Sequence, residues 1–183
     1  MTLNTTSGKL HRFVRRLVYA SVCLALALVL PFLTGQIPTV GSALCPMHVP
    51  VLLCGYLCGG PWAMLVGLIA PPLRFFLFSM PPFPTNAAMA VELAAYGLFA
   101  GLLYRRLPKT RANIYVSLLS SMLLGRICWA IARTILNEAF GTPLTFPLFL
   151  ASAFTNAIPG ILCHIILIPL VVMALKKANI LEE

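Results

Sequence analysis

A series of long apolar runs, separated by short breaks, constrains this chain more than any other feature. The breaks are rich in glycine, proline or basic residues, and the runs cover about 12–33, 47–58, 62–80, 85–104, 114–137 and 148–175. Hydrophobic residues make up 60% of the chain and charged residues only 9%, unlike a soluble domain. Apolar runs of about 20 residues cross a bilayer as helices. The sequence therefore predicts an all-α integral membrane protein, with a single domain built as a bundle of six transmembrane helices.

The basic residues predict how this bundle is oriented. The formal net charge is +9, and most basic residues precede the first run, fill the break after the fourth, or follow the last: Lys9, Arg12, Arg15, Arg16, Arg105, Arg106, Lys109, Arg111, Lys176 and Lys177. Even numbers of crossings separate these three segments, so they share one side. The positive-inside rule places that side, with both termini, in the cytoplasm of a cell membrane. The basicity thus indicates anionic membrane lipid as a partner, and not nucleic acid.

The six cysteines indicate packing and not metal binding or disulfides. Five of them lie within apolar runs, no C-x-x-C motif occurs, and Cys54 and Cys58 are one helical turn apart. Cys45 and His48 would need further converging ligands to hold a metal. We expect neither a metal nor a cofactor, and we interpret His164 as a hydrogen-bonded core histidine.

Two opposite charges flank a proline-rich turn at 80–84. Arg74 lies about six residues before the turn and Glu92 about eight after it, so both are roughly 9–12 Å deep at ~1.5 Å per residue. We therefore expect an Arg74–Glu92 pair. Ionisable groups at such depth usually face a cavity or a partner, which makes the pair a candidate functional site. The alternative is an ion pair that only joins two helices.

Polar residues recur on single faces of the later runs. Thr85, Met89, Glu92 and Tyr96 are spaced by four, three and four residues, as on one helical face. In the fifth run, Arg126, Arg133 and Asn137 share one stripe of the helix. Arg133 and Asn137 lie seven and 11 residues after Arg126, and both steps nearly complete whole helical turns. The predicted solute-binding residues are therefore Arg133, Arg74, Glu92, Asn156, Arg126, Asn137, Tyr96 and His48.

The central outer cluster of Arg74, Glu92, Arg133 and Asn156 carries a formal charge of +1. A guanidinium group binds a carboxylate or phosphate through two hydrogen bonds, so the cluster suits a small anionic solute. We expect Arg133 to be the main anion anchor, with Arg74 held by Glu92. In the competing interpretation, Glu138 neutralises Arg133 and Arg126 binds the solute.

The chemistry that the chain lacks argues against catalysis. It contains four glutamates and no aspartate, and it has no G-x-x-x-x-G-K-[ST], H-E-x-x-H or G-x-S-x-G motif. It therefore cannot be its own P-loop ATPase, and we expect no enzymatic activity. Two alternatives stay open. One is a small secondary transporter that works without ATPases, although no internal repeat is evident. The other is a polytopic membrane enzyme.

Several segments resemble a known transporter family over nearly the whole chain. They are the basic N-terminus, LPFLTGQIPTVGSALCPMHVPVLLCGYLCGGPW, APPLRFFLF and AVELAAYGLFAGLLYRR, within about six spans. The chain is similar to the substrate-binding S components of energy-coupling factor (ECF) vitamin transporters. The resemblance implies a six-helix bundle that binds a vitamin at its outer side, through the later helices and the external loops.

The resemblance also implies partners and a substrate class. An S component docks through helix 1 onto a membrane scaffold subunit, which two cytoplasmic ATPase subunits drive. The family's docking motif is A-x-x-x-A, and its nearest match here runs from Ser21 to Ala25, with serine replacing the first alanine. Among family substrates, the arginine-rich pocket favours pantothenate, which has one carboxylate. Nicotinate, folate, riboflavin and queuosine-type precursors remain open.

Overall fold

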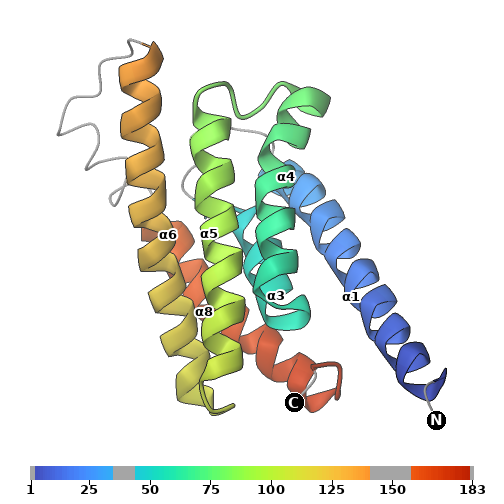
Figure 1. Ribbon diagram of the computed structural model, residues 1–183. Helices are drawn as coiled ribbons and strands as arrows, with labels where there is room; N and C mark the ends of the chain where they lie inside the picture. Colours follow the sequence, from blue (N-terminus) through green and yellow to red (C-terminus); the bar gives the residue numbers. More distant parts are fainter. Residues whose placement is uncertain (1–2, 35–43, 141–157, 182–183) are drawn as a thin grey trace.

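The computed structural model describes residues 3–34, 44–140 and 158–181, with side chains from Gly8 onward. This part of the chain is helical and contains no strand (Figure 1). Its elements are α1 (Leu3–Val29), the 3-10 helix η1 (Leu30–Thr34), α3 (His48–Cys58), α4 (Gly60–Phe78), α5 (Thr85–Arg106), α6 (Arg111–Phe140) and α8 (Ile158–Lys177). The predicted all-α class is confirmed.

Five of the described helical segments are long and apolar enough to cross a membrane: Gly8–Leu33, Gly60–Phe78, Thr85–Arg106, Arg111–Phe140 and Ile158–Lys177. The described helix α3 has only 11 residues, and at ~1.5 Å per residue it is about half as long as the hydrocarbon layer is thick. Nine of its residues are buried, because α1, α4, α5 and α8 pack around it. The chain is thus a multi-pass membrane bundle with a short helix enclosed inside it.

The helix bounds differ in places from the sequence-based ranges. α1 begins at Leu3 instead of 12, and α6 continues to Phe140, so Glu138 belongs to a helix and not to a loop. α4 runs through Pro71 and Pro72 without ending, although proline in a helix interior usually kinks or interrupts the helix. The first ten residues of the expected range 148–175 lie outside the described residues, and so do most of the segments 34–46 and 138–147, which the sequence predicts to be external loops.

Small residues bring α3, α4 and α5 close together. A Cβ atom at Gly97 of α5 would lie 2.7 Å from the Ala63 backbone of α4, and one at Gly55 of α3 would lie 2.9 Å from the Gly97 carbonyl oxygen. A Cβ atom at Gly67 of α4 would lie 2.5 Å from the Leu93 carbonyl group. Close backbone approach of this kind favours helix association in lipid. These contacts set which faces of α4 and α5 remain for other helices.

Both termini and the connection between α5 and α6 lie at the lower end of the bundle in Figure 1. The turn between α4 and α5 and the last residues of α6 lie at the opposite end. The three basic segments of the sequence therefore gather at one end. The positive-inside rule predicts that this end of the bundle faces the cytoplasm.

Candidate functional site

Four helices bring buried polar side chains together near the middle of the bundle. We call this group the polar cluster, and it consists of His48, Glu92, Tyr96, Arg126 and His164. His48 is the first residue of α3, Glu92 and Tyr96 lie one turn apart on α5, Arg126 is on α6, and His164 is on α8. His48, Glu92, Tyr96 and His164 are each at most 3% exposed. Ionisable groups buried in this way within a membrane protein mark a functional-site candidate.

Glu92 is the centre of the polar cluster. Its Oε1 accepts a hydrogen bond of 3.0 Å from the Tyr96 hydroxyl group and lies 3.0 Å from Arg126 Nη1. Its Oε2 lies 3.7 Å from His48 Nε2, which is too far for a hydrogen bond. The Arg126 guanidinium also lies over the Trp129 ring, 5.6 Å from its centroid. The charge of the carboxylate is thus compensated mainly by Arg126. The imidazole of His48 lies beside the carboxylate without a hydrogen bond to it.

The two buried histidines have unused hydrogen-bonding capacity. Their rings stack with centroids 5.8 Å apart, and the His48 ring also lies 5.3 Å from the Tyr96 ring. Within the described part of the chain, none of their four ring nitrogens makes a hydrogen bond of normal geometry, and they have only weaker contacts, of His48 with Glu92 and of His164 with the Cys45 backbone. A buried polar group without a partner costs about 1–3 kcal/mol, so such groups need an explanation. A bound polar solute would supply the missing partners.

The expected Arg74–Glu92 pair is wrong. Arg74 Nη1 donates a hydrogen bond of 2.6 Å to the Leu28 carbonyl oxygen, and its guanidinium lies 5.1 Å and 5.3 Å from the Phe32 and Phe78 ring centroids. Leu28 lies in the last turn of α1, where carbonyl groups lack helical partners. Arg74 therefore faces α1, whereas Glu92 faces α6. Counting residues from the turn predicts one depth for the two residues, but they face different sides of the bundle.

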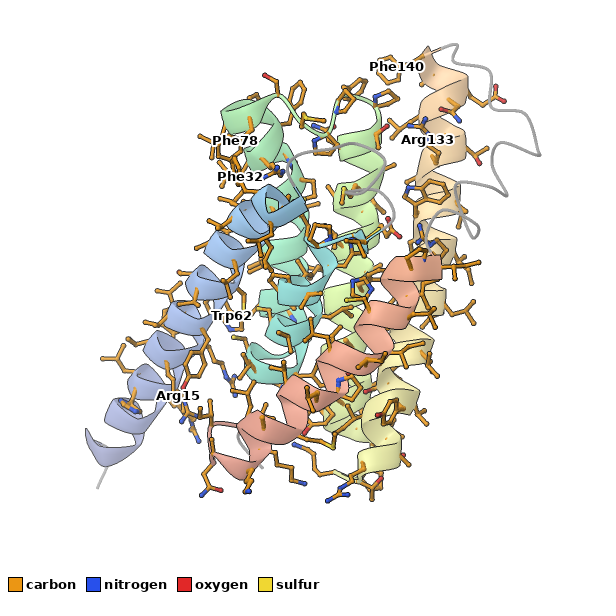
Figure 2. All side chains as sticks on the ribbon, turned by 180° about the vertical axis from the view of Figure 1, so that it is seen from behind. Arg15, Phe32, Trp62, Phe78, Arg133 and Phe140 are labelled. Atoms are coloured by element: carbon orange, nitrogen blue, oxygen red, sulfur yellow. The ribbon has the colours of Figure 1, made fainter. Side chains whose placement is uncertain are left out.

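Arg133 lies toward the Phe140 end of α6, opposite the basic segments, and its side chain points toward α5 (Figure 2). Its Nη1 donates a hydrogen bond of 3.2 Å to Thr85 Oγ1. Seven residues separate it from Arg126, which is about 10 Å along a helix. Among the described residues, Arg133 has no acidic partner, so the suggested neutralisation by Glu138 does not occur there. Arg126 is paired with Glu92, and its contact with the solute stays a prediction.

The remaining predicted residues are placed as follows. Asn137 is buried, at 8% exposure, in the last turns of α6. Ser21 and Ala25 are exposed on α1, and the Ser21 hydroxyl donates a hydrogen bond of 2.9 Å to the Leu17 carbonyl oxygen. Asn156 lies outside the described residues. Among the described residues, no three histidine, cysteine or acidic side chains gather as a potential metal site.

His164 is the site residue that sequence reasoning undervalued. It is buried, as expected, but in the described part of the chain it makes no hydrogen bond of the normal geometry that a core histidine usually has. The only available signal was a polar side chain in an otherwise apolar run. That signal does not show which helix the imidazole faces, and its closeness to His48 follows from the packing of α8 on α3.

The cluster has the chemistry of a binding site for a small polar solute: a compensated ion pair, a phenol, and two imidazoles without a normal hydrogen bond to the described residues. No match to the chain is found among curated proteins. The family model described as ECF transporter, substrate-specific component, matches residues 15–178 and so covers most of the chain. The chain therefore belongs to the family of ECF transporter substrate-specific components.

Proposed function

We propose that the chain captures a small anionic vitamin, with pantothenate as first choice, at the outer side of the cell membrane for ATP-driven uptake. Family membership makes it a substrate-binding transporter subunit that associates with an ECF module. The solute and its place in the bundle are our proposal. The observation that carries the proposal lies beside the buried Glu92–Arg126 pair: four imidazole nitrogens that make no hydrogen bond of normal geometry with any described residue.

The polar cluster suits a solute with hydroxyl or amide groups. A neutral imidazole presents one donor and one acceptor, so His48 and His164 could together satisfy both kinds of group. Because Glu92 and Arg126 compensate each other, their pair adds no net charge. The hydroxyl and amide groups of pantothenate match this part of the site.

Arg133 supplies the attraction for an anion. It is half-buried, it lies about 10 Å from Arg126 along α6, and it is hydrogen-bonded only to a neutral hydroxyl group among the described residues. A carboxylate bound at Arg133 would leave the rest of an extended solute pointing toward the polar cluster. Asn137 lies four residues beyond Arg133 on α6, on the side away from Arg126, and is proposed as a contact for the carboxylate end of the solute. Asn156, which shared a predicted face with this region, is proposed as a further contact.

The decisive experiment identifies the solute and then tests the histidines. Mass spectrometry of ligand that co-purifies with the detergent-solubilised chain identifies the solute, and isothermal titration with pantothenate measures its affinity. We expect His164→Phe to weaken binding by about tenfold or more, because a buried hydrogen bond is lost. The control, His11→Phe, changes an exposed histidine on α1 and should bind normally. Unchanged affinity in His164→Phe and in His48→Phe would place the solute elsewhere.

ATP-driven uptake requires the proposed partners, a membrane scaffold subunit and two cytoplasmic ATPase subunits. Vesicles that contain this chain alone should bind the solute without accumulating it. Accumulation without ATP would instead show a secondary transporter. The bound solute should also be recovered chemically intact, since recovery of an altered product would indicate a membrane enzyme.

A further inference from the structure

A cavity lies at the basic end of the bundle, away from the polar cluster. Its volume is about 770 Å³, within the usual range for small-molecule sites. The start of α6 and the end of α8 form its walls, and both lie at the lower end of the bundle in Figure 1. Four basic residues line it, and none of the described residues that line it is acidic: Lys109, Arg111, Lys176 and Lys177.

Contacts within the chain hold this cavity together. Lys176 Nζ donates a hydrogen bond of 2.9 Å to the Lys109 carbonyl oxygen, which ties the end of α8 to the segment before α6. Asn113 Nδ2 donates a hydrogen bond of 2.7 Å to the Pro108 carbonyl oxygen and so braces the same segment. The basic groups are therefore gathered by structure and not only by sequence.

The charge of the cavity indicates an anionic ligand. Arg111 is the first residue of α6, so the positive end of a 30-residue helix dipole adds to the basic side chains. Phosphate groups bind readily at such helix ends. Arg111 and Lys177 are exposed, and neither has an acidic partner among the described residues.

The other walls of the cavity are apolar and continue toward the membrane interior. Leu170 lines the cavity, and its side chain is 60% exposed on α8, a helix that is apolar enough to span a bilayer. It precedes Lys176 by six residues, or roughly 9 Å along the helix. Met173 and Ala174 lie between these levels. A free phosphate would contact only the basic side chains of the cavity. A phospholipid would contact the basic side chains with its headgroup and the apolar wall with an acyl chain.

We propose that this cavity binds the phosphate headgroup of an anionic phospholipid, with an acyl chain lying along the Leu170 side of α8. Basic pockets between membrane helices are suited to such headgroups. The site is separate from the solute site and does not depend on which vitamin is bound. It would place a bound lipid between α6 and α8 at the end of the bundle where the basic segments gather.

Native mass spectrometry of the full chain in neutral detergent tests this proposal. We expect retention of phosphatidylglycerol over phosphatidylcholine with the same acyl chains. The double variant Arg111→Gln/Lys177→Gln should lose roughly 30-fold in affinity for phosphatidylglycerol, about fivefold per charge. The control, Lys9→Gln/Arg12→Gln, removes the same charge from an exposed part of α1 outside the cavity and should retain the lipid.

A second variant tests the cavity without changing any charge. Ala174 is exposed and lines the cavity, so Ala174→Trp should fill the space and displace the lipid without disturbing the core. Equal loss in the Lys9/Arg12 control would overturn the proposal in favour of general charge attraction. Equally tight binding of free glycerol 3-phosphate would also overturn it, because the ligand would then be a soluble phosphate. Retention of the lipid in both cavity variants would exclude this site.

Discussion

Glu92 Oε1 lies 3.0 Å from Arg126 Nη1, so one ion pair joins α5 to α6 inside the bundle. Removing two charges from water is costly, and their attraction offsets that cost only while both are present. Each member of the pair therefore depends on the other. The Tyr96 hydroxyl group donates to the same carboxylate oxygen and helps to hold it toward α6.

Glu92→Gln should destabilise the fold strongly. The substitution leaves the Arg126 guanidinium buried without its counter-charge, a change that costs about 3–5 kcal/mol for buried pairs. Thermal unfolding in detergent measures the effect. Glu138→Gln is the matched control, since Glu138 is exposed on α6 and should unfold like the parent chain. Equal midpoints for the parent and Glu92→Gln would show that the pair contributes nothing to stability.

Arg133→Ala should weaken binding of the anionic solute by roughly 10- to 150-fold, because a hydrogen bond to a charged group contributes about 1.5–3 kcal/mol. Isothermal titration with the co-purified solute measures this loss. Arg106→Ala, an exposed change at the other end of the bundle, should leave affinity unchanged. Full affinity in Arg133→Ala, with loss in Arg126→Ala, would move the anion site to the ion pair.

Ser21→Trp or Ala25→Trp should block assembly with the scaffold subunit while solute binding survives. Both positions are exposed on α1, and a bulky side chain there would prevent close approach of another helix. Co-purification of the complex provides the measurement. Leu123→Trp, on an exposed position of α6, is the control and should assemble normally. Intact complexes with both α1 variants would exclude this face as the docking surface.

Gly97→Ala should destabilise the contact between α4 and α5. The added Cβ would lie 2.7 Å from the Ala63 backbone, which cannot move aside as a flexible side chain could. Overpacking of this kind costs about 1–3 kcal/mol. Gly8→Ala is the control, because nothing lies within 4 Å of a Cβ at that position. Comparison of unfolding midpoints separates the two, and equal midpoints would show that the helices can shift apart.

The orientation of the bundle can be tested at two exposed positions. Ser79 lies just after α4 and Thr110 just before α6, at opposite ends of the bundle. In intact cells, an impermeant maleimide should label Ser79→Cys and spare Thr110→Cys, with the parent chain as background. The reverse pattern would contradict the placement of both termini in the cytoplasm.

The sequence alone determined the class of this protein and part of its site. Long apolar runs must become helices in lipid, because every backbone polar group has to be satisfied within its own segment. The same local logic identified the polar face of α5, since residues four apart meet on one helix. The hydrogen bond between Tyr96 and Glu92 agrees with the prediction that these two residues share one helical face. The family resemblance, carried by several segments, was confirmed by the match over residues 15–178.

Only the tertiary structure decided which charges meet. Counting residues from a turn gives the depth of a side chain, but its direction around the helix axis depends on which faces pack together. The close contacts of Gly67 and Gly97 set α4 against α5, and Arg74 then faces α1 while Glu92 faces α6. The meeting of His48 with His164 likewise depends on how α8 packs against α3. Such relationships join residues far apart in the chain, so no local spacing could reveal them.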